Sequence, residues 1–204
     1  MACPLFCYGT LLSDALWLRE TSTTPDTPII AMLKGYRRFD VPGRTYPGIF
    51  PYNPVTTAPD RDDVANVKGA IRQVESEAVY RLLDRYEGAE YDRKIVDVET
   101  PHGLVSVETY VYRVDMALSF TDNASSFEGI AGARTLAVNF NGTRVGSAKL
   151  DASAPFRLRV LAIAVDTELS GLGIGMRLVE RARALAMREN RTFSLREGII
   201  AGDF

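Results

Sequence analysis

The sequence LLDRYEGAEYDR, residues 82–93, places four carboxylates close together around one glycine. Such a cluster is ordinarily a solvated surface, because each carboxylate repels the others and prefers water. Ser76 can cap a helix that leads into this segment, and Gly88 is placed to end it. Apolar residues between them recur at the i, i+3, i+4, i+7 spacing of one helix face: Val79, Leu82, Leu83 and Tyr86. We therefore expect a helix over residues 76–87 that packs one face on a core.

The carboxylates of this region are not equivalent on that helix. At 100° per residue, Glu77 and Asp84 fall opposite the apolar stripe, where solvated surface is expected. Glu87 falls at the edge of the stripe in the last turn, where the helix dipole costs an anion ~0.3–1 kcal/mol and partial burial adds desolvation of the same sign. Both effects raise the pKa of Glu87 toward the range useful for moving a proton. A tolerated helix-end residue is the alternative, and Glu90 and Asp92 are interpreted as surface charges.

Composition limits the class of protein. The chain has 204 residues, of which 46% are hydrophobic and 25% charged, and its net charge is −2. These values are typical of a globular protein and provide no basic field to recruit nucleic acid or an anionic membrane. No apolar run reaches the ~18 residues of a membrane span. The start, MACPLFCYGTLL, is interpreted as a strand and not a signal peptide. We expect a cytoplasmic protein with a small-molecule substrate and no nucleic-acid or membrane partner.

Cysteine and histidine are too scarce for several kinds of site. Cys3 and Cys7 are too few for a disulfide framework or a four-ligand zinc site, and two small buried thiols are the simpler interpretation. His102 is the only histidine and lies in an expected turn between two strands. A Ser-His-Asp or Cys-His site would depend entirely on it. We expect no metal and no cofactor.

Along the chain, residues 1–115 contain strands and one principal helix, which indicates a mixed, mainly antiparallel sheet that closes on itself. Residues 42–54 carry four prolines and two glycines and are expected to be an irregular surface segment. Residues 116–133 are small, polar and weakly periodic, and are interpreted as a linker. Residues 134–204 then predict an Asn-Gly hairpin, a strand, a glycine-rich turn, a helix over 174–190 and a last strand.

Four motifs of the first part occur in order: FCYGTLL, VPGRTYPGIFP, LLDRYEGAEYDR and VETYVYR. Together they resemble the γ-glutamylcyclotransferase-like family, in its AIG2-like branch, over residues 5–114. The resemblance implies an α+β fold, a small mixed β-barrel with a cavity. It also implies that the glutamate of the EG motif, Glu87, is the catalytic acid/base.

The resemblance assigns further residues to the cavity. The YGTL loop, Tyr8, Gly9, Thr10 and Leu11, would supply backbone donors to the substrate. This is physically reasonable, because a strand that breaks at glycine can turn successive amides one way to bind a carboxylate or an oxyanion. An ordinary strand-ending turn is the alternative. The motif GRTYPG makes Tyr46 and Pro47 candidate wall residues. Tyr110 and Tyr112 share a strand face, and Tyr112 is favoured to reach the cavity, with core packing as the alternative for both.

The reaction that the resemblance implies is the release of 5-oxoproline from a γ-glutamyl amine, by attack of the substrate's own amine on its γ-carbonyl. Glu87 would take the proton from the ammonium and return it to the leaving amine, so a cyclotransferase of this kind needs no cofactor. A second hypothesis is a lyase or isomerase of specialised metabolism that keeps the fold and the glutamate. A third is an acyl-coenzyme A-binding or interaction protein.

The third hypothesis depends on VLAIAVDTELSGLGIGMRLVERARALA, residues 160–186. It resembles the turn that binds coenzyme A pyrophosphate in GNAT acetyltransferases, with matches at Gly171, Gly173 and Gly175. Ser170 stands where that family has a basic residue or glutamine. The resemblance spans about 134–200 and lacks the family's opening and closing elements, which indicates a truncated GNAT-like unit. We expect it to complete its sheet on the first domain or on a second copy in a homodimer, and to bind acetyl-coenzyme A weakly or not at all.

Overall fold

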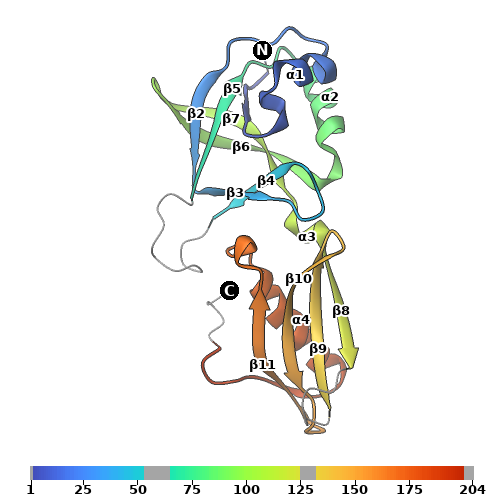
Figure 1. Ribbon diagram of the computed structural model, residues 1–204. Helices are drawn as coiled ribbons and strands as arrows, with labels where there is room; N and C mark the ends of the chain where they lie inside the picture. The colour runs from blue at the N-terminus through green and yellow to red at the C-terminus, as the bar shows by residue number, and fades with distance from the viewer. Residues whose placement is uncertain (1, 53–64, 125–131, 200–204) are drawn as a thin grey trace. The chain divides into compact units, whose positions relative to one another are not determined.

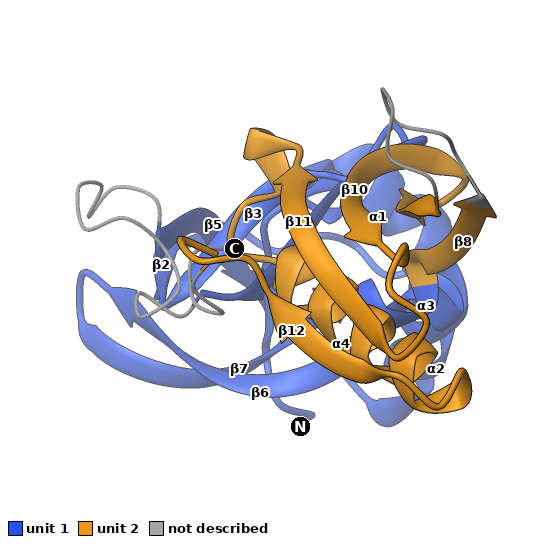
Figure 2. Ribbon diagram, turned by 90° about the horizontal axis from the view of Figure 1, so that it is seen from below, with its two compact units in different colours: residues 1–52, 60–116 blue, residues 53–59, 117–204 orange. Residues whose placement is uncertain are grey.

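The computed structural model describes residues 2–52, 65–124 and 132–199, which form parts of two compact units (Figure 1). One unit comprises residues 1–52 and 60–116, and the other comprises residues 53–59 and 117–204 (Figure 2). Among the described residues, no helix is both long enough and apolar enough to cross a membrane.

The first unit is built on a closed barrel with the strand order β1-β5-β2-β6-β7. The strands of the unit are β1 (Leu5–Cys7), β2 (Ile29–Lys34), β3 (Tyr36–Asp40), β4 (Pro47–Pro51), β5 (Asn66–Arg72), β6 (Tyr91–Thr100) and β7 (Gly103–Tyr112). β1 pairs antiparallel with β5 and parallel with β7, and this parallel pair closes the sheet. The expected small mixed barrel is therefore confirmed.

Apolar side chains from every barrel strand and from β4 fill the core. In β2 and β6 they occupy every second position, as period-two patterning requires, whereas β1 and the end of β7 are buried on both faces. The buried cluster is Phe6, Ala31, Leu33, Ile49, Val67, Ile71, Val96, Val98, Val107 and Val111. The packed core makes the barrel a rigid scaffold that positions the loops connecting its strands.

β4 corrects one expectation from the sequence. Residues 47–51, within the segment expected to be irregular, pair with β3 in a two-stranded sheet, and residues 53–54 lie outside the described residues. Ile49 and Phe50 are buried. The prolines are tolerated because they stand at the two ends of β4, which pairs on one side with β3.

Two helices accompany the barrel, α1 (Asp14–Thr21) and α2 (Glu77–Glu87), and they pack on each other. Short 3₁₀ turns, η1 (Thr10–Leu12) and η4 (Gly88–Glu90), precede α1 and follow α2. α2 confirms the expected helix: Ser76 is at the N-cap with extended backbone, although its side chain makes no capping hydrogen bond. Gly88 ends the helix with a φ of 71°, which glycine adopts without penalty.

The second unit is a five-stranded sheet in the order β12-β11-β10-β9-β8. Its elements are β8 (Leu118–Ala124), β9 (Ala133–Phe140), β10 (Thr143–Asp151), β11 (Arg157–Val165), η5 (Thr167–Leu169), α4 (Ile174–Arg188) and β12 (Thr192–Leu195); α3 (Val114–Ala117) precedes β8. α4 packs against β9, β10, β11 and β12 (Figure 1). Asn141 and Gly142 make the expected hairpin turn, both with positive φ.

The linker expected over residues 116–133 is wrong for residues 118–124, which form β8, while residues 125–131 lie outside the described residues. β8 pairs antiparallel with β9, with Leu118 opposite Phe140. Leu118 and Phe120 are half-buried, whereas Ser119 and Thr121 are exposed. This alternation is that of an edge strand, and it is weak because only one face is covered. The homodimer and the GNAT-like role of this unit stay predictions.

Candidate active site

A cavity of about 150 Å³ lies beside the end of α2 in the first unit. It is lined by residues from five places in the chain: Phe6, Cys7, Tyr8, Gly9, Thr10, Leu11, Tyr46, Pro47, Tyr86, Glu87, Tyr91 and Tyr110. The barrel fold thus brings together the YGTL loop, both wall residues of the GRTYPG motif and the candidate glutamate. Within the described residues, no group of three or more His, Cys, Asp or Glu side chains is arranged to hold a metal ion.

Tyr112 is the candidate that the structure does not bring to the cavity. Tyr110 lines it instead, so the preference for Tyr112 is wrong. Tyr112 is buried, with its ring in edge-to-face contact with Phe39 at 5.7 Å and Tyr91 at 5.1 Å between centroids. The two tyrosines do share a face of β7, but Tyr112 lies one step further along the strand, where these aromatic rings cover it.

Glu87 is the last residue of α2 and is half-buried. Burial raises the pKa of its carboxyl from 4.5 to about 7, because the charged form loses its hydration. Among the described residues, no hydrogen bond or ion pair to this carboxyl is found. A carboxyl with such a pKa and no fixed partner can both accept and return a proton near neutral pH.

The YGTL loop turns as η1 beside Glu87. The Leu12 amide donates to the Gly9 carbonyl at 3.1 Å, and the Ser13 amide donates to the Thr10 carbonyl at 3.1 Å. No hydrogen bond from the amides of Thr10 and Leu11 is found within the part of the chain that the structure describes. Both residues line the cavity, so two backbone donors are available there.

Gly9 packs closely against the opposite wall of the cavity. A Cβ atom at this position would lie 3.3 Å from Pro47 Cγ, closer than ordinary van der Waals contact. The glycine therefore lets the loop approach the opposite wall of the cavity.

Tyr46 is held at the cavity wall by a carboxylate that was interpreted as a surface charge. Its hydroxyl donates to Glu90, and Arg44 Nη2 lies 2.6 Å from the other oxygen of the same carboxylate. The Arg44 guanidinium, assisted by the Tyr46 hydroxyl, holds the pKa of Glu90 below its usual value. Burial raises the pKa of Tyr46 to about 12, so its hydroxyl keeps its proton. Glu90 is thus part of the cavity wall's support.

Asp84, expected on the solvated face of the helix, is 41% exposed but also binds two side chains beside the cavity. The hydroxyl of Tyr110 donates to Asp84 Oδ1 at 2.7 Å, and Arg93 Nε lies 3.2 Å from the same oxygen. Tyr8 donates from its own hydroxyl to the Tyr110 carbonyl at 2.7 Å. Burial raises the pKa of Tyr8 and of Tyr110 well above the ordinary value. These phenols are therefore fixed, neutral wall groups.

Several lining residues were not identified from the sequence. Tyr91 follows the EG motif directly and donates from its hydroxyl to the Pro47 carbonyl at 2.8 Å. Tyr86 belongs to the predicted apolar stripe, but its hydroxyl lies 3.0 Å from Thr10 Oγ1. Cys7 is buried, and burial raises the pKa of its thiol, so it is a neutral wall group. Tyr86 and Tyr91 could have been identified from the sequence, because both are aromatic residues close to Glu87.

Comparison with known proteins identifies a matching family and a curated relative. The family described as gamma-glutamyl cyclotransferase, AIG2-like, matches residues 5–126. A curated protein of Arabidopsis thaliana named AIG2-like protein C is 34% identical over 112 residues, which are 53% of this chain and 58% of that protein. The chain therefore spans little more than half of that relative's length.

Two solved structures show weaker similarity. A gamma-glutamyl cyclotransferase is 18% identical, with 54% of this chain and 66% of that chain covered and a TM-score of 0.42. An aminoglycoside acetyltransferase from an uncultured soil metagenomic sample is 12% identical, with 41% of this chain and 80% of that chain covered and a TM-score of 0.35. Neither similarity is high enough to carry an argument about function.

Proposed function

The chain belongs to the gamma-glutamyl cyclotransferase, AIG2-like family, and from this premise we propose that it releases 5-oxoproline from a γ-glutamyl amine. The observation that carries the proposal is the Glu87 carboxyl, which lines the cavity without a fixed partner and has its pKa raised to about 7. A group of this kind matches the need of the reaction for one residue that takes a proton and later returns it.

In the proposed mechanism, Glu87 removes a proton from the α-ammonium of the bound substrate. The freed amine attacks the γ-carbonyl carbon, forms the carbon–nitrogen bond of a five-membered ring and places negative charge on the carbonyl oxygen. The unpartnered amides of Thr10 and Leu11 are the candidate donors to that oxygen. Glu87 then returns the proton to the leaving amine as the original amide bond breaks, and the ring nitrogen gives its second proton to the released amine, which departs as an ammonium ion.

The walls support a compact substrate. Five tyrosines line the cavity: Tyr8, Tyr46, Tyr86, Tyr91 and Tyr110. Several of their hydroxyls are already bound to carboxylates or backbone carbonyls, which fixes the rings and leaves their apolar faces to enclose a ligand. Rings held in this way exclude water from the reacting atoms and favour ring closure over hydrolysis.

A second candidate is a lyase or isomerase that uses the same glutamate. One observation favours it: among the described residues that line the cavity, none is lysine or arginine. A γ-glutamyl substrate carries an α-carboxylate, which would have to be bound by neutral donors, backbone amides and hydroxyls, whereas a neutral substrate needs no such partner.

The test incubates the purified protein with γ-glutamyl derivatives of small primary amines and measures 5-oxoproline and free amine by mass spectrometry. We expect both products in equal amounts from the wild-type protein, and ~10²–10⁴-fold slower release of both from Glu87→Gln. If the wild type releases no 5-oxoproline from any of them, the cyclotransferase proposal fails. Rearrangement of a neutral substrate that depends on Glu87 would then favour the second candidate.

A further inference from the structure

Arg72 is a buried cation next to the candidate site. It is the last residue of β5, where it lies opposite Leu5 of β1, and its side chain is 0% exposed. It does not line the cavity. Placing a guanidinium inside a protein is costly unless its donors are bound, so the partners of Arg72 indicate its task.

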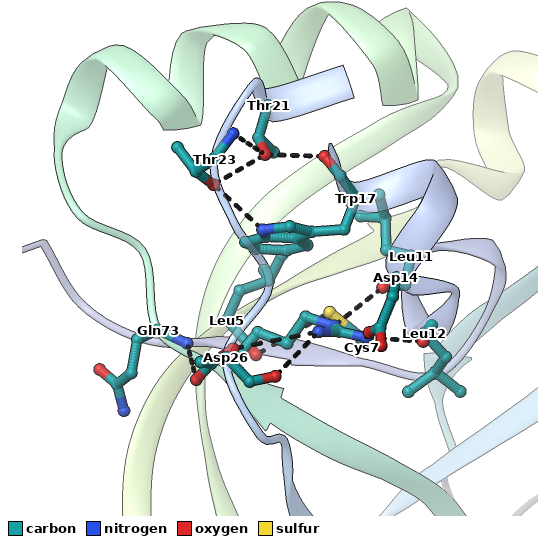
Figure 3. A network of polar contacts seen from close by, with 11 residues as sticks. Leu5, Cys7, Leu11, Leu12, Asp14, Trp17, Thr21, Thr23, Asp26 and Gln73 are labelled. Atoms are coloured by element: carbon teal, nitrogen blue, oxygen red, sulfur yellow. Dashed lines mark hydrogen bonds and ion pairs between the residues drawn. The ribbon is translucent and has the colours of Figure 1, made fainter. Parts of the chain in front are cut away.

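Most of these partners belong to one turn. Arg72 Nε donates to the Leu11 carbonyl at 3.1 Å, and Nη2 donates to the Leu12 carbonyl at 2.6 Å and to Asp14 Oδ1 at 2.6 Å. Figure 3 shows this network around Leu11, Leu12 and Asp14. The remaining contacts are with the Asp26 carbonyl at 3.4 Å, the Asp26 carboxylate at 4.0 Å and the Trp17 ring, whose centroid is 5.3 Å away.

The peptide group between Leu11 and Leu12 is held at both ends. Its carbonyl accepts from Arg72, and its amide donates to the Gly9 carbonyl at 3.1 Å. The Gly9 carbonyl belongs to the peptide group whose amide is that of Thr10. The orientation of the Thr10 amide is therefore tied to Arg72 through a single intervening peptide group.

The next peptide group repeats the arrangement. The Leu12 carbonyl accepts from Arg72, and the Ser13 amide of the same group donates to the Thr10 carbonyl at 3.1 Å. The Thr10 carbonyl shares its peptide group with the amide of Leu11. The peptide groups that carry the Thr10 and Leu11 amides are thus both oriented by Arg72 through one intervening peptide group.

We propose that Arg72 is a positioning residue, which holds the Leu11 and Leu12 carbonyls so that the Thr10 and Leu11 amides are presented to the cavity as a preformed pair of donors. The inference rests on the proposed function, because the pair has a task only where negative charge develops on the substrate. Arginine suits this task since its planar guanidinium directs several donors in fixed directions. A lysine ammonium in its place keeps the charge but loses the fork.

The first experiment compares Arg72→Lys with Arg191→Lys. Arg191 is a matched control, because its Nη1 also binds backbone carbonyls, those of Ala152, Ala154 and Arg157, but in the second unit. We expect Arg72→Lys to lower kcat by ~10–10²-fold, with KM within ~3-fold and the midpoint of the pH–rate profile unchanged, since Glu87 is untouched. Arg191→Lys should lower the melting temperature without lowering kcat. A kcat of Arg72→Lys within ~2-fold of the wild type, or a loss confined to KM, would overturn the proposal.

The second experiment needs no substrate. Amide hydrogen exchange of Leu12 and Ser13, which close the turn, should accelerate by ~10-fold or more in Arg72→Lys, while exchange in the β6–β7 hairpin stays as in the wild type. Unchanged exchange at both amides overturns the proposal whatever the activity. If the wild type fails to act on γ-glutamyl amines, the proposed function fails, and the exchange data still decide whether Arg72 holds the turn.

A second variant guards against misfolding of Arg72→Lys. Asp14 has a side chain that is 69% exposed, so Asp14→Asn should fold while it weakens one anchor of the guanidinium. We expect a 2–5-fold fall in kcat, on the order of one weakened hydrogen bond to a charged group, with faster exchange at Leu12 and Ser13. Suppose that Arg72→Lys does not fold. The proposal is then rejected if Asp14→Asn has the kcat of the wild type and the wild-type exchange rates at Leu12 and Ser13.

Discussion

Glu87 and Glu90 lie three residues apart at the end of α2, yet the two carboxylates meet opposite surroundings. Glu87 lines the cavity, has no hydrogen-bond or ion-pair partner among the described residues, and has its pKa raised to about 7 by burial. Glu90 lies at the wall beside Tyr46, which donates to it, and Arg44 binds it at 2.6 Å and lowers its pKa. One carboxyl is left able to exchange a proton, and the other is fixed in the charged state.

The difference shows that the partners of a residue decide its task. The two glutamates share a residue type and one short segment, so neither composition nor charge distinguishes them. Because Glu90 is satisfied by two donors, it stabilises the position of the Tyr46 ring. Because Glu87 has none, its proton affinity is set by desolvation and can be used in catalysis.

The largest effect is expected at Glu87. Glu87→Gln keeps the shape of the side chain but removes its basicity, so turnover should fall by ~10²–10⁴-fold while circular dichroism and melting remain those of a folded protein. Asp92→Asn is the control, since Asp92 is exposed and contacts only Arg113, at 3.5 Å, among the described ion pairs. Asp84→Asn is not a suitable control, because Asp84 accepts a hydrogen bond from the cavity residue Tyr110. Near-normal turnover by Glu87→Gln would end the acid/base assignment.

A further effect concerns stability against pH. The folded protein keeps the Glu87 proton up to about pH 7, whereas the unfolded chain loses it near 4.5, so between these values the folded state binds more protons and stability falls as pH rises. The shift corresponds to ~3 kcal/mol. Urea unfolding should therefore show that the free energy of unfolding of Glu87→Gln, relative to the wild type, rises by about this amount from pH 4.5 to 8. A constant difference across this range would contradict the raised pKa.

A smaller effect is expected at the wall. Glu90→Gln leaves an oxygen for the Tyr46 hydroxyl but loses the charge that binds Arg44, and partly exposed ion pairs are worth only ~0–1 kcal/mol. KM should rise ~2–5-fold, with kcat within ~2-fold of the wild type, in steady-state kinetics. If kcat of Glu90→Gln instead fell as far as that of Glu87→Gln, Glu90 would act in the reaction itself and not only as a support of Tyr46.

The smallest effect is expected outside the barrel. The turn before α4 has the glycines of a phosphate-binding motif but Ser170 at its head, so acetyl-coenzyme A should give little or no thermal shift. A ligand at 100 times its Kd would stabilise by ~2.7 kcal/mol, which is readily measured. A large thermal shift with acetyl-coenzyme A that is absent in Gly173→Glu would instead favour a function of the second unit over one at Glu87.

The features that depend on local sequence patterns could be predicted from the sequence. The helix ending at Gly88 follows from its apolar stripe and its stop signal, and the hairpin at Asn141 follows from its turn residues. The position of Glu87 at the edge of that stripe was enough to predict a raised pKa, although burial is the cause that the structure supports. The other cavity candidates came from the resemblance of the motifs to a family.

What the sequence could not reveal depends on contacts between distant segments. Tyr46 meets Glu90 across 44 positions, and Arg72 meets Leu11 across 61, and no periodicity encodes such pairs. The choice of Tyr110 over Tyr112 depends on where β3 and β6 place the rings of Phe39 and Tyr91. β8 was missed because an edge strand with one covered face has a weak apolar pattern.

The raised pKa of Glu87 is tested most directly by a carbon-13 NMR titration of the side-chain carboxyls, with the Glu87 signal assigned by its loss in Glu87→Gln. We expect Glu87 to titrate with a midpoint near 7 and Glu90 to titrate below 4.5. Titration of Glu87 near 4.5, together with Glu90, would contradict the claim that the cavity prepares one carboxyl to move a proton.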